Sequence, residues 1–485
     1  MLLNYAQDSI NKKQHIKISR INKQKRLEWL TFEIPRSELF EWSKDPASGI
    51  KDNEMVDWET GKTVYRKNAK YLNKFRMVEL LETLPSSKKD LIYEYNEPYK
   101  SYCDIETEML GRSIDQMMHD PVERILTVCI FDEETNFVNV YGIKNIDKKD
   151  NLEMEDRFKE YFKDFPIVQS IKFKFNFFSN EFDMLYHLFS KVFRKQLAIM
   201  GWNFVFFDWA YLVKRARRLG IDPEICAEDH KLDVKDLRPK HKLVLDLKEM
   251  FEKWSKWGID LENLTLDEVA NKVLGVKKVK YNGTLQELYE NGYGKYIFYN
   301  IVDTILCKLI DDNKKTFLTF MMIAALGKIE SIRAFSPVHF TETVFCRNFL
   351  DEKKVLVLSD ISQEYNEKID GGFVKEPEKG VHSLIAGVDF ASLYPNIKIM
   401  LNISPESFLG YKDDLISRGI DISDKHVSII GTVFDNKDSV TKMLLKNYYS
   451  KRKEHKKKMF EIEIEIDRLT KILKQKENAL QSSNL

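Results

Sequence analysis

Alternating apolar and polar side chains near residue 100 place the strongest constraint on the fold. Tyr99–Ile105, Ile125–Phe131 and Phe137–Tyr141 repeat with a period of two, which predicts three strands of one sheet. Glu181–Gly201 instead has apolar side chains at helical spacing and predicts one amphipathic helix. Because strands and helices follow one another along the chain, we expect an α/β domain over roughly residues 96–325.

Shorter patterns predict further elements. Apolar runs at Trp202–Phe206 and Leu384–Val388 predict short strands, each followed closely by an aspartate. The segment from about residue 438 onward has one long helical pattern. Other helices are expected at Tyr211–Leu219, Leu285–Tyr289 and Ile297–Ile310.

Composition narrows the class of protein. A chain of 485 residues suggests about three domains, and 32% charged with 43% apolar residues is typical of a globular protein. The five cysteines include no Cys-x-x-Cys pair, and no apolar run of about 18 residues occurs, so neither a zinc ribbon nor a membrane span is expected. The first residues lack a signal-peptide core, which favours a cytoplasmic protein.

Three segments place acidic side chains where a metal site would need them. Asp104 and Glu106 are two residues apart on a predicted strand, so both lie on one face, while Ile105 points into a core. Asn203 precedes Asp208 at the end of an apolar run. Tyr299 and Asp303 are four residues apart on a predicted helix and share a face.

Carboxylate oxygens are the ligands that Mg²⁺ and Mn²⁺ prefer. Two such ions roughly 4 Å apart can activate a water and stabilise the leaving oxygen in phosphodiester hydrolysis. Each of these motifs alone is common at exposed positions without any function. The three together, in this order, favour a two-metal hydrolytic site.

The order Asp-x-Glu, Asn-x-x-x-x-Asp, Tyr-x-x-x-Asp resembles the exonuclease motifs of the DEDDy 3′–5′ proofreading superfamily. Later motifs are similar to those of family B DNA polymerases, in particular the type found in T-even-like bacteriophages. They are Gly372-Phe-Val-Lys-Glu-Pro377, Asp389-Phe-Ala-Ser-Leu-Tyr-Pro395, Asn402-Ile-Ser-Pro-Glu406 and Lys451-Arg-Lys-Glu-His-Lys456.

The resemblance implies a fold and a domain order. It implies an α/β multidomain chain, with an RNase H-like exonuclease domain of mixed sheet flanked by helices, a partial palm and a long fingers helix. The expected boundaries are an N-terminal domain at 1–95, an exonuclease at 96–325, a return to the N-terminal domain at 326–368, a partial palm at 369–437 and a fingers helix at 438–485.

The resemblance also implies roles for single residues. Asp104, Glu106, Asp208 and Asp303 would hold the exonuclease metals, Tyr299 would assist the attacking water, and Asn203 would lie near the substrate strand. Asp389 would hold polymerase metal, and Tyr394 would stack under the deoxyribose. The remaining assignments are Phe390, Ala391, Ser392 and Leu393 to the triphosphate, and Gly371, Gly372 and Phe373 to the DNA backbone.

Basic side chains concentrate near the end of the chain although the net charge is only +1. Residues 442–458 hold eight Lys or Arg and one Glu. Arg452 and Lys456 are four residues apart, one turn after Tyr449, and two cations on one helical stripe can clamp a triphosphate. A solvated basic face is the alternative, but the upstream Asp389 segment favours nucleotide binding.

Two motifs of the family do not occur in the sequence, namely Lys-x-x-x-Asn-Ser-x-Tyr-Gly and Tyr-Gly-Asp-Thr-Asp. Asp389 alone cannot hold two polymerase metals. Met459, Ile462, Ile466, Leu469 and Leu473 form a coiled-coil-like seam that needs a partner. We therefore expect the N-terminal subunit of a split phage replicative polymerase, acting on primer-template and single-stranded DNA with dNTPs and a C-terminal subunit.

Two other functions stay open at this point. The chain could be a self-sufficient 3′–5′ exonuclease with a vestigial palm, because its set of exonuclease acids is complete. It could also be a non-catalytic nucleic-acid-binding regulatory module. Salt-dependent binding without cleavage would support that function.

Overall fold

The computed structural model describes residues 1–485 except 11–12, 59, 358–374 and 484–485. The chain divides into two compact units. Met1–Glu38 and Leu80–Val344 form the first unit, and Leu39–Glu79 and Phe345–Leu485 form the second. Among the described helices, none combines the length and the apolar character that crossing a membrane would require.

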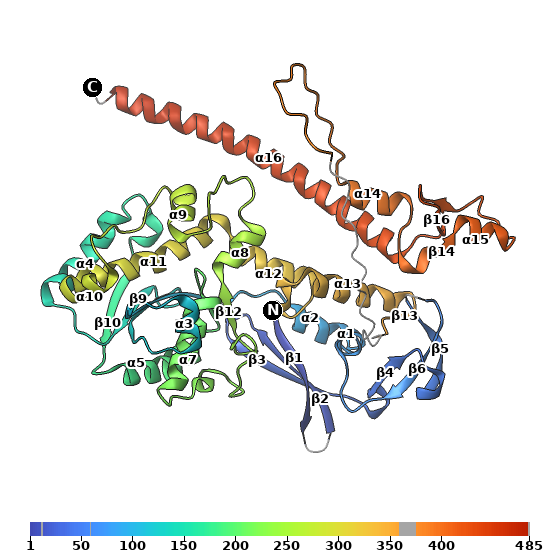
Figure 1. Cartoon of the computed structure of the whole chain (residues 1–485), viewed down its shortest axis with the longest axis horizontal. Coiled ribbons are helices and arrows are strands. Elements are labelled where there is room, and N and C mark those ends of the chain that lie inside the picture. The colour runs from blue at the N-terminus through green and yellow to red at the C-terminus, as the bar shows by residue number, and fades with distance from the viewer. Residues whose placement is uncertain (11–12, 59, 358–374, 484–485) are drawn as a thin grey trace. The chain divides into compact units, whose positions relative to one another are not determined.

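A six-stranded mixed sheet forms the centre of the first unit (Figure 1). The strand order is β10-β9-β8-β7-β11-β12. Strand β8 pairs antiparallel with β7 and β9, whereas β10, β11 and β12 join in parallel. The strands span Lys100–Thr107 (β7), Ile125–Asp132 (β8), Phe137–Gly142 (β9), Lys172–Phe177 (β10), Ala198–Gly201 (β11) and Leu243–Asp246 (β12). The expected mixed sheet flanked by helices is confirmed.

Helices cover both faces of this sheet (Figure 1). Each face has its own apolar core. Alternation along β7 decides which side chain enters which core: Tyr102 packs on the side of α11, and Cys103 and Ile105 pack on the side of α5 and α7. The helices span Ile114–His119 (α3), Lys148–Tyr161 (α4), Glu181–His187 (α5), Phe193–Lys195 (α6), Ala210–Arg218 (α7), Leu247–Trp254 (α8), Leu266–Leu274 (α9), Leu285–Asn291 (α10), Tyr293–Lys314 (α11) and Thr316–Gly327 (α12).

The segment around residue 200 differs from the sequence prediction. The predicted helix over Glu181–Gly201 ends at Lys195, and its last residues form strand β11. The predicted strand Trp202–Phe206 is wrong: the chain turns at Asn203, with φ of +63°, and enters a helical turn at Val205–Trp209. Ala198–Gly201 becomes a strand because it pairs with both β7 and β12, contacts that are remote in sequence.

The N-terminal strands β1 (Leu2–Ile10), β2 (Lys13–Ile21) and β3 (Leu27–Glu33) form an antiparallel sheet of the first unit. The buried Ser19 Oγ lies 2.9 Å from His241 Nδ1, and Ser331 Oγ donates to the Leu2 carbonyl at 2.6 Å. These bonds attach the sheet to residues that lie far away in the sequence.

The second unit contains two small sheets and a helix of 44 residues, α16 (Val440–Ser483). Helix α16 confirms the predicted C-terminal helix. The strands span Phe40–Ser43 (β4), Ile50–Asp57 (β5), Thr63–Asn68 (β6), Lys354–Val355 (β13), Phe408–Tyr411 (β14), His426–Val427 (β15) and Thr432–Phe434 (β16), and the other helices span Leu393–Met400 (α14) and Lys412–Ser417 (α15). Helices α1 (Lys74–Glu82), α2 (Ser86–Tyr93) and α13 (Pro337–Asp351) complete the chain.

The predicted strand Leu384–Val388 is wrong for this structure. These residues have no regular secondary structure, and Leu384 and Val388 are 102% and 88% exposed. An extended segment becomes a strand only when another strand accepts its hydrogen bonds, and none of the strands in the described residues does so here.

Residues 402–406 secure the start of α16. The buried Asn402 donates to the carbonyls of Asp435 and Lys437 and accepts from the Ser439 amide. Glu406 Oε1 accepts the Val440 amide at 2.8 Å, and Ser439 Oγ caps the Lys442 amide. The motif Asn402-Ile-Ser-Pro-Glu406 therefore explains where the long helix begins.

Gly201 is predicted to tolerate no side chain. A Cβ at this position would lie 2.2 Å from the Cys103 carbonyl oxygen. We expect Gly201→Ala to lower the free energy of unfolding by about 1–3 kcal/mol, because overpacking forces the backbone of β7 to move. Chemical denaturation followed by circular dichroism measures this. Gly387→Ala, where a Cβ meets nothing within 4 Å, is the control, and equal stability of the two variants would contradict the expectation.

Candidate active site

Three of the predicted acids meet between β7 and α11. Asp104 and Glu106 lie on the face of β7 that packs against α11, the helix that carries Asp303. One carboxylate oxygen from each of these three residues lies within 4.8 Å of the other two. Alternation along the strand and the buried face of the helix thus bring Asp104 and Asp303 together, although they are 199 positions apart in sequence.

Asp208 lies next to this cluster but its carboxylate is held differently. It is 5% exposed on the helical turn Val205–Trp209, and its Oδ1 accepts the backbone amide of Ile105 at 3.2 Å. Burial raises the pKa of the Asp208 carboxyl, and the nearby Asp104 carboxylate raises it further. The fourth acid is therefore adjacent to the cluster rather than part of it.

Asp246 secures the turn that carries Asp208, a role that none of the predicted motifs assigned to it. It is 1% exposed at the end of β12, and its Oδ2 accepts the Val205 amide at 3.2 Å. Its Oδ1 accepts the Glu249 amide and so caps α8. The run Leu-Val-Leu-Asp before a helix was the sequence signal that could have identified it.

Lys278 is a second residue that sequence reasoning missed. It lies between α9 and α10, and its Nζ forms an ion pair with Asp303 and donates to the Tyr299 hydroxyl at 3.0 Å. No motif surrounds it, since residues 277, 278 and 280 are all lysines and only the tertiary structure selects one of them. Tyr281 packs edge-on against Tyr299 at 5.5 Å between ring centroids.

A cleft of about 470 Å³ opens onto these groups. It is wide enough to admit a nucleotide-sized ligand and combines charged, amide and apolar side chains. Its lining comprises Asp104, Trp202, Asn203, Lys248, Asn263, Leu264, Thr265, Leu266, Lys278 and Asp303. The predicted substrate-side residue Asn203 is thus on the cleft wall with two of the acids.

Burial controls the protonation of the cluster. Removal from water raises the pKa of Asp104 to about 7, and the nearby Asp303 carboxylate adds to this effect. Burial also raises the pKa of Asp303 to about 6, against the opposing effect of the Lys278 ammonium. The pKa of Glu106 is raised by burial and then by Asp104. Repulsion between carboxylates in a desolvated site favours either bound protons or a bound cation.

The donor set fits a hard divalent cation. All three ligand groups are carboxylates, and Asp303 Oδ1 is buried with no hydrogen-bond partner in the part of the chain that the structure describes. Mg²⁺ and Mn²⁺ prefer such oxygen ligands. Asp104, Glu106 and Asp303 are therefore the residues that would hold a first ion, with Asp208 adjacent.

The predicted polymerase residues are on the surface of the second unit. Asp389 is exposed, and Phe390, Leu393 and Tyr394 are 70%, 42% and 78% exposed. Arg452 and Lys456 lie exposed on α16. Ala391 and Ser392 lead into α14, while Gly371, Gly372 and Phe373 lie outside the described residues.

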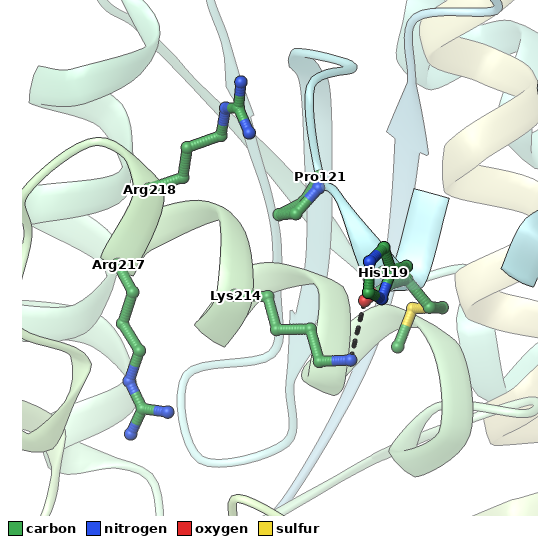
Figure 2. A pocket seen from close by; sticks show the side chains of 6 residues that line it. His119, Pro121, Lys214, Arg217 and Arg218 are labelled. Atoms are coloured by element: carbon green, nitrogen blue, oxygen red, sulfur yellow. Dashed lines mark hydrogen bonds between the residues drawn. The ribbon is translucent and has the colours of Figure 1, made fainter. Parts of the chain in front are cut away.

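A basic groove of about 490 Å³ lies elsewhere on the first unit (Figure 2). Its lining is Met118, His119, Pro121, Lys214, Arg217 and Arg218. Lys214 Nζ donates to the Met118 carbonyl at 2.7 Å, Arg218 pairs with Asp120, and Arg217 lies 3.6 Å from Glu224. Its cations are partnered, and it shares no residue with the acid cleft.

Two separate segments of the chain match families of known proteins. Residues 79–241 match the family "DNA polymerase family B, exonuclease domain", and residues 340–482 match "DNA polymerase family B". The chain is 28% identical over 225 residues to the DNA-directed DNA polymerase of Escherichia phage RB69, which covers 44% of this chain and 24% of that protein.

Two further relatives are similar to this chain at comparable identity, and again only over part of their length. The DNA-directed DNA polymerase of Enterobacteria phage T4 is 26% identical over 320 residues, covering 61% of this chain and 35% of that protein. The DNA polymerase of Archaeoglobus fulgidus is 28% identical over 236 residues, covering 44% of this chain and 27% of that protein. The matched part of each is about a quarter to a third of its length.

The raised pKa of Asp104 predicts an unusual pH dependence. The folded chain without metal holds this proton up to about pH 7, whereas the unfolded chain loses it near pH 4. The free energy of unfolding should therefore fall as pH rises between these values. We expect Asp104→Asn to be more stable than the parent at pH 8 in EDTA, by about 4 kcal/mol, and equal to it at pH 4.

Thermal denaturation at both pH values measures this difference. Adding Mg²⁺ at pH 8 should raise the melting temperature of the parent but not that of the variant. A variant that is less stable than the parent at pH 8 in EDTA would contradict the prediction.

Proposed function

We propose that this chain, which carries an exonuclease domain and part of a polymerase domain of the family B DNA polymerases, is the proofreading part of a split phage replicative polymerase. In this proposal it removes nucleotides from the 3′ end of DNA in the cytoplasm of an infected cell. The observation that supports the hydrolytic role most directly is the cluster of Asp104, Glu106 and Asp303 at the cleft.

Divalent metal, when bound by these carboxylates and by Asp208, would supply Lewis-acid activation of water and charge neutralisation, with two ions per site in the proposed chemistry. The protein groups have separate tasks. The Tyr299 hydroxyl is fixed by Lys278, and burial followed by the Asp303 charge raises the pKa of Tyr299, so it stays a neutral phenol that can hold a water by hydrogen bonding. Burial lowers the pKa of Lys278, but contacts with Asp303 and Tyr299 outweigh this effect and raise the pKa above its ordinary value. The ammonium therefore stays charged and offsets part of the negative charge.

The cleft walls suit a single-stranded end. Trp202 is held by a bond from its indole nitrogen to the Leu264 carbonyl at 3.0 Å, which presents a fixed aromatic surface. An aromatic ring of this kind can stack on a base whatever its identity. Asn203 and Lys248 add an amide and a cation that can contact the sugar-phosphate backbone.

In the proposal the polymerase half remains incomplete on this chain. Asp389 and Tyr394 would supply one metal ligand and the sugar-stacking ring, and Arg452 and Lys456 would contact the triphosphate. The second aspartate motif and the second fingers motif do not occur among the 485 residues. A C-terminal polymerase subunit would provide them together with the thumb.

Exposed apolar surface supports the need for a partner. The seam on α16 comprises Met459, Ile462, Ile466, Leu469 and Leu473, whose side chains are 47–60% exposed. Val381, Leu384, Ile385 and Val388, upstream of Asp389, are 80–105% exposed. Continuous apolar surface of this kind is characteristic of an interaction site.

Hydrolysis without a partner is a second candidate. All four exonuclease acids, Tyr299 and Lys278 belong to one compact unit, Met1–Glu38 with Leu80–Val344. That unit needs no residue from the second unit to form the cluster, which favours an exonuclease that is active on its own.

The hydrolytic role predicts that Asp208→Ala loses Mg²⁺-dependent degradation of single-stranded DNA. The loss should exceed the about 10- to 100-fold effect of removing a residue that only supports a metal ligand. Release of nucleotides from a 3′-labelled strand measures it. Glu160→Ala, at an exposed position of the same unit, is the control. Full activity of Asp208→Ala, or salt-dependent binding by the parent without any cleavage, would refute the proposal.

The split-polymerase role predicts primer extension only in the presence of the C-terminal subunit. We expect Ile466→Asp to weaken co-purification with that subunit at least about tenfold, since one buried charge in an apolar seam costs more than 1.4 kcal/mol. Gln475→Asp lies off the seam on the same helix and is the matched control. Extension by the chain alone, or no pairing of the parent with any such subunit, would show that the split assignment is wrong.

A further inference from the structure

Asn300 connects the two elements that carry the acid cluster. It lies on α11 between Tyr299 and Asp303 and is completely buried. Its amide Nδ2 donates to Asp104 Oδ2 on β7 at 2.6 Å. The hydrolytic steps proposed above do not require this bond, yet it joins a ligand on the strand to the helix that supplies another ligand.

The orientation of the Asn300 amide is itself determined. Thr127 Oγ1 on β8 donates to Asn300 Oδ1 at 3.3 Å, and Thr127 is also fully buried. If the amide were reversed, its oxygen would face the Asp104 carboxylate, and two acceptors would meet. The hydroxyl of Thr127 therefore keeps the NH₂ group on the carboxylate.

A neutral amide is well suited to this position. A lysine or arginine there would form an ion pair with Asp104 and compete with a divalent cation for the same oxygens. The Asn300 amide restrains one oxygen of Asp104 and leaves the charge of the cluster unchanged. Since Asn300 precedes Asp303 by three residues on the same helix, this bond also fixes how close the acids of β7 come to Asp303.

We propose that Asn300 is a positioning residue of the hydrolytic site, which holds Asp104 in the orientation that a divalent cation needs, and that Thr127 orients Asn300. The proposal rests on the proposed exonuclease function. It assigns the hydrogen bonds from Thr127 to Asn300 and from Asn300 to Asp104 to metal binding rather than to DNA contact.

Titration of the full chain with Mn²⁺, with free Mn²⁺ followed by electron paramagnetic resonance, tests the assignment without relying on activity. Asn300→Leu keeps the volume and removes the donor, and we expect its dissociation constant for Mn²⁺ to rise about 10- to 100-fold. Thr127→Val should cause a smaller rise. Thr304→Val is the matched control, because Thr304 is equally buried on α11 and its Oγ1 donates to the Asn300 backbone carbonyl.

Hydrolysis of single-stranded DNA supplies a second readout. Because Asn300 does not line the cleft, Asn300→Leu should lower kcat and leave KM for DNA unchanged. Mn²⁺ dissociation constants for Asn300→Leu and Thr127→Val equal to that of Thr304→Val would overturn the proposal. If Asn300→Leu does not fold, the comparison of Thr127→Val with Thr304→Val decides the question.

The outcomes separate the two proposals. Mn²⁺ binding that depends on Asn300 in a parent chain that does not cleave DNA would refute the exonuclease function and support the positioning role. Cleavage by the parent, with unchanged Mn²⁺ binding and kcat in Asn300→Leu, would support the exonuclease function and overturn the positioning role.

Discussion

The packing of α11 against β7 is the contact on which the first unit depends. Ile301, Val302 and Ile305 on the helix share an apolar core with Tyr102 on the strand. At the far end of the contact the Tyr102 hydroxyl donates to Asp311 at 2.6 Å, and Lys100 pairs with the same carboxylate. Core burial and this polar anchor set the register in which Asp303 faces Asp104 and Glu106.

The same packing imposes an electrostatic cost. Burial raises the pKa values of both Asp104 and Asp303, and for Asp104 the neighbouring Asp303 carboxylate adds repulsion. Lys278 compensates part of the charge by contacting Asp303. The apolar cores on both faces of the sheet outweigh the cost, so the fold keeps a site that favours a cation. Stability and chemistry are therefore opposed at this position, as is common for functional sites.

The candidate residues of the second unit are exposed, unlike the acid cluster of the first unit. Asp389 and Tyr394 are exposed, and the apolar residues before Asp389 form no strand with any described segment. The long helix α16 has a well-defined start, because Asn402, Glu406 and Ser439 satisfy its first backbone groups. Its segment from Met459 to Leu473 carries exposed apolar side chains. Local hydrogen bonds suffice to form the helix, whereas the residues before Asp389 find no strand partner among the described residues.

The sequence by itself determined the elements whose periodicity is strong and local. Strands β7, β8 and β9, helix α11 and helix α16 follow from spacing alone, and so does the placement of Asp104 and Glu106 on one face. Strand β11 was not predictable, because Ala198–Gly201 is extended only through its pairing with β7 and β12. Lys278, Asn300 and Asp246 were not recognised either. Their roles depend on hydrogen bonds and ion pairs across 25 to 196 residues of chain, distances that only the tertiary structure closes.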